Sequence, residues 1–258
     1  MKGILIAAAS AILSTTAYAQ SFKIATGEPL HSTQQEMAVK GRQGLMIKQK
    51  LTFGDYRTAM VKRSAIRKWT GVTGFPGSIW TEHMEGKQSI HFRLANTTGG
   101  DTSDVMTVTN VMTNDLLLGT PAGHTRLQGS IVPLFQQTDI SKNNYSVSIV
   151  TRPGDEPWEM FLDNTEAQVR RKHPAGYVAR GDVYYTIEPV WQVEKKNGEL
   201  ANMPFGSPGF EIKNSNGDAL AAVSLIDNGK VYLGPGTAEE KALFANVCTA
   251  LLLQSVIN

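Results

Sequence analysis

The stretch TAEEKALFANVCTALLLQSVIN, residues 237–258, decides the fold that we expect for this chain. Thr237 and Glu240 match a Thr-x-x-Glu capping box, in which each side chain accepts a hydrogen bond from the other residue's backbone amide, so a helix should begin here. Between Ala242 and Ile257 the only polar residues are Asn246, Thr249, Gln254 and Ser255. These four point in different directions at about 100° per residue, and a helix without a polar face is expected to be buried on every side.

The rest of the chain predicts many short β-strands. Alternating or β-branched patterns favour strands at 45–51, 57–63, 79–84, 89–94, 105–112, 145–149, 158–162, 183–193, 210–212, 220–226 and 230–233. We interpret 20–40 as an extended arm or first strand, 71–78 as a loop and 163–182 as an exposed connection. Glu85-Gly86-Lys87 is interpreted as a hairpin turn, and the Asn-Gly pairs at 216–217 and 228–229 favour type I′ turns, in which both residues need positive φ.

The predicted fold class is mainly β, a single antiparallel barrel of about ten to twelve strands around the C-terminal helix, because the interior of a barrel widens with strand number. The alternative is a β-sandwich with the helix packed on one face, which would leave Asn246 and Gln254 in contact with water. In the barrel the helix fills the space where a smaller barrel holds a ligand, so any function is expected on the outer surface or the rim. The apolar run is shorter than the roughly 20 residues that span a bilayer, so no transmembrane segment is expected.

The N-terminus has the pattern of a signal peptide. Lys2 precedes an apolar run at 4–13, and Ala17-Tyr18-Ala19 is a small-x-small cleavage site. We expect cleavage near Ala19, a mature chain of one β-rich domain at 20–258, and a periplasmic or secreted location.

Charge and cysteine content exclude several classes of protein. The chain has 25 Lys and Arg against 23 Asp and Glu, and this balance lacks the basic footprint of a nucleic-acid-binding protein, so no nucleic-acid partner is expected. The only cysteine, Cys248, lies inside the predicted helix, so no intrachain disulfide can form. We expect Cys248 to be a buried, unreactive side chain.

The end of the chain resembles a known family. The resemblance lies in Phe210-Glu211-Ile212, the segment from Asn216 to Val223, Lys230-Val231-Tyr232-Leu233 and an acidic-started helix that ends with Ala250-Leu251-Leu252-Leu253. This order is similar to the closing part of the tubby C-terminal-like fold, the group that includes the LURP-one-like and phospholipid-scramblase-like proteins. The resemblance covers 210–258 and, loosely, the 45–63 hairpin. It implies a β-barrel wrapped around a hydrophobic C-terminal helix, and the family's membrane roles do not carry over, because no ion-binding or phosphoinositide-binding motif matches.

Motifs for catalysis are absent from the sequence. No Gly-x-Ser-x-Gly nucleophile elbow is present. The closest candidate metal ligands are Glu82, His83, Glu85 and His91. In the predicted 79–94 hairpin, His83 and Glu85 would share a face and His91 would approach from the partner strand, although a solvated hairpin face is the simpler interpretation. We expect no cofactor and no metal.

Basic residues give the other candidate site. The residues predicted to bind an anionic ligand are Arg57, Lys62, Arg63, Arg67 and Lys68, and a second basic group is Arg170, Arg171 and Lys172. Separately, each group is typical of a solvated face, and together they could form an anion-binding surface. The four tryptophans, Trp69, Trp80, Trp158 and Trp191, are expected in the core or at its rim. A tryptophan exposed at a cleft would instead indicate contact with lipid or glycan.

Two functions follow from these patterns. The first is a secreted or periplasmic non-enzymatic protein with a structural or binding role, for which a lipid or anionic surface is the expected partner. The alternative is a hydrolase with an unrecognised, metal-dependent site.

Overall fold

The computed structural model describes residues 22–43, 49–73, 79–118, 125–126, 142–168, 174–204 and 206–254. The predicted signal peptide, the start of the 45–51 strand and the basic group Arg170 to Lys172 lie outside these residues.

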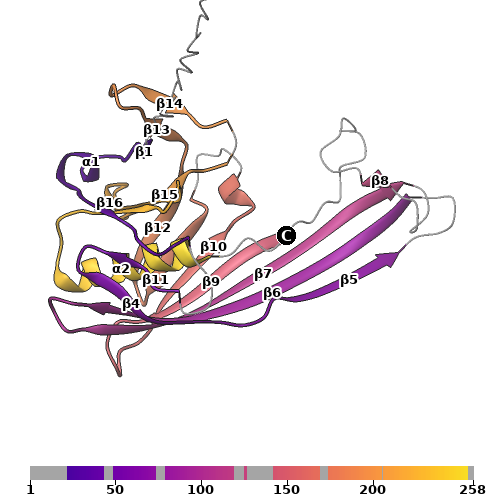
Figure 1. Cartoon of the computed structure of the whole chain (residues 1–258), viewed down its shortest axis with the longest axis horizontal. Coiled ribbons are helices and arrows are strands. Elements are labelled where there is room, and N and C mark those ends of the chain that lie inside the picture. Colours follow the sequence, from indigo (N-terminus) through magenta and orange to yellow (C-terminus); the bar gives the residue numbers. More distant parts are fainter. Residues whose placement is uncertain are drawn as a thin grey trace, which may run out of the picture.

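Twelve antiparallel strands follow one another in a single path that nearly closes into a barrel (Figure 1). In chain order they are β2 (Gln35–Ala38), β3 (Thr52–Phe53), β4 (Tyr56–Arg63), β6 (Ile79–Asn96), β7 (Thr102–Leu118), β9 (Lys142–Val150), β10 (Trp158–Asp163), β11 (Gly176–Arg180), β12 (Val183–Val190), β15 (Gly209–Lys213), β16 (Ala219–Ser224) and β17 (Lys230–Leu233). Their order in space is β2-β17-β16-β15-β12-β11-β10-β9-β7-β6-β4-β3. The two ends of this path meet where Lys40 and Thr52 exchange backbone hydrogen bonds of 2.9 and 3.1 Å. The predicted barrel is therefore confirmed.

Helix α2 (Ala238–Leu253) is the core of the barrel. It begins at the predicted capping box, where the Glu240 amide donates to Thr237 Oγ1 at 3.2 Å and the Thr237 amide donates to Glu240 Oε2 at 2.8 Å. Every residue from Leu243 to Leu253 is buried. The described helices include none with the length and apolarity that crossing a membrane requires.

Two polar side chains of α2 donate hydrogen bonds inside the barrel, although Asn246 Oδ1 has no partner among the described residues. Asn246 Nδ2 donates to Ser103 Oγ of β7 at 2.9 Å, and Thr249 Oγ1 donates to the Ala245 carbonyl at 2.7 Å. From the barrel wall, the Tyr145 hydroxyl donates to the Ala250 carbonyl at 2.8 Å. Asn246 is only 1% exposed, which rules out the sandwich alternative in which this side chain contacts water. Burial also raises the pKa of the Cys248 thiol far above its usual range, as expected for an unreactive cysteine.

A smaller sheet lies beside the barrel and corrects two expectations. Its strands are β1 (Lys23–Ile24), β13 (Gln192–Glu194) and β14 (Leu200–Asn202), in the order β1-β13-β14. The strand predicted at 183–193 breaks at Trp191, since β12 stays in the barrel and β13 pairs in the smaller sheet. The segment 20–40, interpreted as an extended segment or first strand, instead contains β1, the short helix α1 (Leu30–Thr33) and β2.

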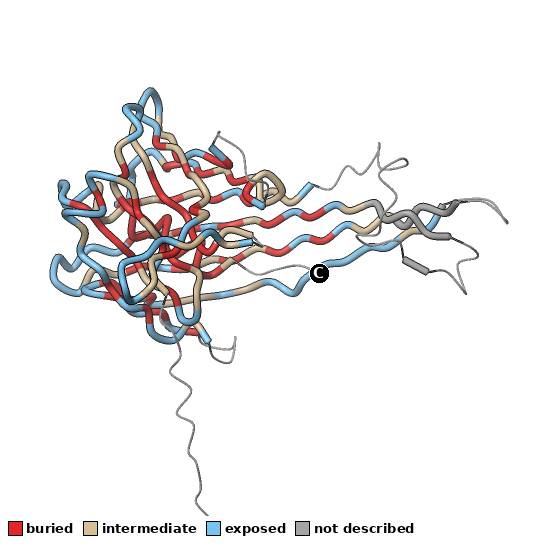
Figure 2. Tube along the Cα trace, turned by 90° about the horizontal axis from the view of Figure 1, so that it is seen from above, coloured by how far each residue is buried: buried red, intermediate tan, exposed pale blue. Residues whose placement is uncertain are grey.

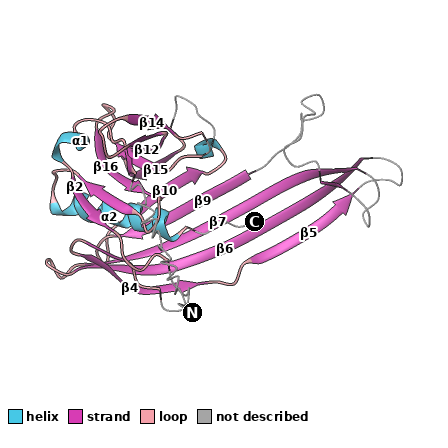
Figure 3. Cartoon of the chain, turned by 45° about the horizontal axis from the view of Figure 1, so that its top comes forward, coloured by secondary structure: helices cyan, strands magenta, loops and turns pink. Residues whose placement is uncertain are grey.

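Strands β6 and β7 are much longer than the rest, with 18 and 17 residues, and they leave the barrel side by side (Figures 1 and 3). Strand β5 (Arg67–Thr73) pairs with the outer part of β6, and β8 (Thr125–Arg126) with the end of β7. We call this projection the arm: β5, residues 79–87 of β6, residues 110–118 of β7, and β8. Buried residues concentrate in the barrel, whereas β5 runs along the arm as an exposed strand (Figure 2).

The hairpin predicted at 79–94 is wrong, because these residues belong to the single strand β6. Glu85, Gly86 and Lys87 are in the middle of β6, paired with Val111 and its neighbours in β7 and with Arg67 to Trp69 in β5. Ladders on both sides use the backbone hydrogen-bonding groups of this segment, so it stays extended instead of turning. The predicted loop at 71–78 is likewise wrong at its start, because 71–73 belong to β5.

Two further predictions need correction. The segment 163–182, interpreted as an exposed connection, contains the 3-10 helix η1 (Glu166–Gln168) and strand β11. Both Asn-Gly hairpins are present between β15, β16 and β17, but neither asparagine has positive φ: the residues that do are Gly217 (86°) in the first turn, and Asp227 (53°) and Gly229 (91°) in the second. These turns are therefore not of type I′, which needs positive φ at the asparagine as well.

Candidate functional site

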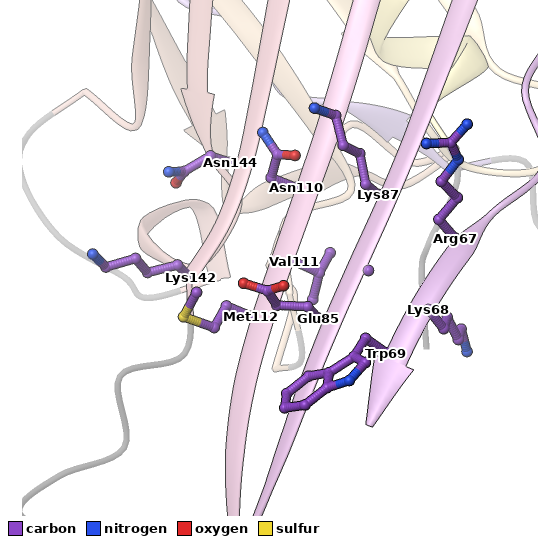
Figure 4. Close-up of a pocket in the computed structure, with 11 residues that line it drawn as sticks. Arg67, Lys68, Trp69, Glu85, Lys87, Asn110, Val111, Met112, Lys142 and Asn144 are labelled. Atoms are coloured by element: carbon purple, nitrogen blue, oxygen red, sulfur yellow. The ribbon is translucent and has the colours of Figure 1, made fainter. Parts of the chain in front are cut away.

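A groove of about 560 Å³ crosses β5, β6, β7 and β9 at the base of the arm (Figure 4). Cross-strand pairing sets its side chains in two rows. The first row is Arg67, Lys87, Asn110 and Asn144, and the second is Trp69, Glu85, Met112 and Lys142. Directly opposed residues, and residues two apart on a strand, lie on the same face of a sheet. Both rows therefore lie on the outer face, because the alternate residues Gln88 and Ile90 are buried inside the barrel.

The groove carries an excess of positive charge. Arg67, Lys87 and Lys142 line it with exposed side chains, and the exposed Lys68 borders it from the opposite face of β5, because it alternates with Arg67 and Trp69. Within the described part of the chain, none of these four cations forms an ion pair. Arg67 is directly opposite Lys87, and like charges in this position destabilise a sheet. Glu85 is the only acid among the described residues that line the groove, so an anionic ligand would be attracted there.

Trp69 forms an open aromatic surface at one end of the groove. Its side chain is on the exposed edge of β5, with 59% of the residue surface accessible. The indole lies against the backbone of Gly71, since a Cβ built on Gly71 would be 2.5 Å from Trp69 Cη2 and 2.9 Å from Cζ2. Only a glycine at this position leaves room for the ring to lie in this way.

Of the five predicted anion-binding residues, the structure places Arg67 among the side chains of the groove and Lys68 beside it on the opposite face of β5. Lys62 and Arg57 are exposed, but on the barrel wall: Lys62 is opposite His91, about 13 Å along β6 from the position of Lys87, and Arg57 is opposite Ala95, about 26 Å along.

Arg63 points to the inside of the barrel and not to the surface. It is opposite the buried Ile90, and its Nη2 donates to Gln49 Oε1 at 2.8 Å. Burial lowers the pKa of Arg63, while the nearby Tyr145 hydroxyl acts in the opposite direction. Arg63 therefore lies apart from the exposed cations with which the sequence grouped it.

The predicted convergence of metal ligands is wrong. Glu82, His83, Glu85 and His91 are all on the single strand β6. His83 and His91 are eight residues apart on this strand, a separation of about 26 Å. His91 Nε2 is instead 2.7 Å from Asp104 Oδ1 of β7, and no group of three potential metal ligands occurs among the described residues. The hydrolase hypothesis loses the only site that the sequence offered it.

Sequence reasoning missed Lys87, Lys142, Asn110 and Asn144. Lys87 was assigned to a turn, and interpreting 79–96 as one strand would have placed it on the face of Glu85. Lys142 had no such signal, because it enters the groove only through the pairing of β9 with β7.

No family model, no curated protein and no solved structure matches this chain. The groove and its charges are thus the basis for inferring a function.

Proposed function

We propose that this protein is a non-enzymatic binding module that takes an anionic ligand in the groove of the arm. The observation that supports this proposal is the set of three exposed groove cations without ion pairs among the described residues, Arg67, Lys87 and Lys142. Holding Arg67 opposite Lys87 costs about 0.2–1 kcal/mol, and a bound anion would remove this cost. The ligand can be a free anionic molecule or the headgroup layer of a lipid surface, since both present negative charge.

We further propose that the mature chain, 20–258, acts as one β-rich domain in the periplasm or outside the cell, after cleavage near Ala19. The signal-peptide pattern of the N-terminus supports this location. N-terminal sequencing of the protein exported by its natural host tests it, and an intact Met1 in the exported fraction would contradict it.

The finer assignment of the barrel to the tubby-like group is also a proposal. Its support is the order of the last elements, in which β15, β16 and β17 lead into the capped, buried helix α2. An experimental structure in which the strands surround the helix in a different order from that family would exclude the assignment.

Binding of the mature protein to defined polyanions tests the main proposal. The probes are phosphatidylcholine vesicles with and without phosphatidylglycerol, and soluble polyglutamate. We expect binding to at least one anionic probe and none to pure phosphatidylcholine. Substituting both Arg67→Gln and Lys87→Gln should weaken that binding by about tenfold or more, equivalent to about 1.4 kcal/mol.

The matched control replaces two exposed cations of the barrel wall, Arg57→Gln with Lys62→Gln, and has the same change in net charge. It should bind within about twofold of the unsubstituted protein, because these residues are about 13 Å or more from the groove along the sheet. Failure to bind any polyanion, or an equal loss in the control, would refute the proposal.

A further inference from the structure

We infer that the ligand of the groove is an acidic glycan, a chain of sugar rings that carries carboxylate or sulfate groups. This inference rests on the proposed function and narrows it. Three features of the groove lead to it: one acid among the cations, an aromatic ring with an open face, and the separation of the charges across the sheet.

The first feature is Glu85. Its carboxylate can only accept hydrogen bonds, and it is in the row between Trp69 and Met112. A ligand with negative charge alone, such as a polyphosphate, would be repelled by Glu85 and could donate nothing to it. A sugar acid has both kinds of group, anions for Lys87 and Arg67 and hydroxyl donors for Glu85.

Two amides extend the same argument. In the first row, Asn110 is next to Lys87 and Asn144 is next to Asn110, and each side chain offers two N–H donors and one acceptor oxygen. Hydroxyl groups, which donate and accept, match these amides, whereas carboxylate or phosphate oxygens use only the donors. The floor of the groove therefore fits a polyhydroxylated ligand.

The second feature is Trp69. Because Gly71 lets the indole lie against the strand, one face of the ring is covered while 59% of the residue remains accessible. The apolar face of a sugar ring stacks on such a surface. A single-stranded nucleic acid would use several aromatic residues in succession for its bases, and within the described part of the groove Trp69 is the only aromatic side chain.

The third feature is the distribution of the cations. Arg67 is on β5 and Lys142 on β9, three strand spacings apart, which is about 14 Å across the sheet. A small anion would contact one end of the groove only. A chain of several sugars that crosses the strands would reach both ends, with Trp69 and Asn144 along its path (Figure 4).

Affinity of the mature protein for four probes tests the inference: polygalacturonate as the acidic glycan, dextran as a neutral glycan, polyglutamate as a polyanion without sugar, and phosphatidylglycerol vesicles. We expect polygalacturonate to bind about tenfold or more tightly than polyglutamate or the vesicles at equal charge, a difference of one decade in Kd. Dextran should not bind measurably.

The key variant is Gly71→Ala, which leaves every charge and Trp69 itself in place. The added methyl group displaces the indole, so the affinity for polygalacturonate should fall about fivefold or more, while the unfolding temperature stays unchanged. Thr70→Ala, at the adjacent position on the opposite face of β5, is the control and should bind like the unsubstituted protein.

The outcomes separate this inference from the proposed function. Equal binding of polyglutamate or vesicles, or full affinity in Gly71→Ala, overturns the glycan inference and leaves the anion groove standing. Binding of none of the three anionic probes overturns both.

Discussion

Strands β6 and β7 run through two regions of the molecule that treat charge in opposite ways. In the barrel wall, Asp104 of β7 pairs with Arg93 of β6 at 3.0 Å and lies 2.7 Å from His91 Nε2, so a carboxylate compensates Arg93, whereas Arg57 and Lys62 of β4 form no ion pair among the described residues. In the arm, Lys87 on the same face of the same strand is opposite Arg67 and has no ion pair among the described residues. Along β6, the barrel wall thus pairs Arg93 with a carboxylate, and the arm leaves Lys87 available for a ligand.

The two regions also differ in what holds them together. Ile90 and Phe92 of β6 are buried against the core that surrounds α2. In the arm, the ladder between β5, β6 and β7 keeps the strands extended, and Trp69 and Met112 remain 59% and 39% exposed. Substitutions in the barrel should therefore change the stability of the fold, and substitutions in the groove should change binding.

Deletion of α2 is the strongest test of this division. A chain that ends at Gly236 loses every buried side chain from Leu243 to Leu253, and full burial of each large apolar one contributes about 1.5–3 kcal/mol. For the six large ones, Leu243, Phe244, Val247, Leu251, Leu252 and Leu253, the sum is roughly 9–18 kcal/mol, as large as the total stability of about 5–15 kcal/mol that is typical of a domain. We expect no cooperative thermal transition by circular dichroism. A truncated protein that stays soluble and unfolds cooperatively would show that the barrel does not depend on its helix.

Leu251→Ala tests the contribution of one side chain of α2 to the stability of the barrel. Leu251 is 2% exposed, so its truncation leaves a cavity and should lower the free energy of unfolding by about 2–5 kcal/mol in urea denaturation. Trp69→Ala removes a larger side chain from the arm, yet should change stability by no more than about 0.5 kcal/mol, because that residue is mostly exposed. Equal effects of the two substitutions would erase the distinction between barrel and arm.

The same division separates what the sequence could predict from what it could not. The capping box at Thr237 and the apolar run after it are local signals that predict the helix. The barrel is predicted because a helix without a polar face has to be buried on every side. The course of β6 is not local: Gly86 between two charged residues has the composition of a turn, and only the ladders from β5 and β7 keep it extended.

A β-bulge explains the misplacement of Arg63. The register between β4 and β6 shifts between Thr58 and Met60, so the residues that follow change faces. Without the bulge, Arg63 would share the outer face with Arg57 by simple alternation. The groove itself depends on the pairing of β9 with β7, which brings Lys142 beside residues far away in the sequence.

Lys87→Gln should separate stability from binding within the arm. Removing one of two opposed like charges should raise the free energy of unfolding by about 0.2–1 kcal/mol at low salt, although the same substitution contributes to the loss of anion binding. The gain should shrink at 0.5 M salt, because salt screens the repulsion. Lys196→Gln, an exposed lysine in the turn between β13 and β14, is the control and should be neutral. A Lys87 variant that is less stable at low salt would mean that its charge is compensated in the folded arm.

The smallest expected effect is at Asp104, the carboxylate that pairs with Arg93 in the barrel wall. Partial burial raises the pKa of this carboxyl, but hydrogen bonds and charges from Arg93 and His91 outweigh burial and hold the pKa below the ordinary value of 3.8. A carboxyl whose pKa is lower in the folded state stabilises the protein above its unfolded pKa, and this contribution is lost as the pH falls through the folded value.

Asp104→Asn should therefore be less stable than the unsubstituted protein at pH 7, and the difference should narrow from about pH 4 downwards. Because the Asp104 side chain is 43% exposed, solvent screening limits the difference at pH 7 to about 0.5 kcal/mol. Urea midpoints at pH 7 and pH 3 measure it, with Asp101→Asn as a control, since that exposed carboxylate forms no ion pair among the described residues. A difference that is equal at both pH values would mean that Asp104 does not stabilise the barrel wall through its charge, and the contrast with the uncompensated cations of the arm would lose its electrostatic basis.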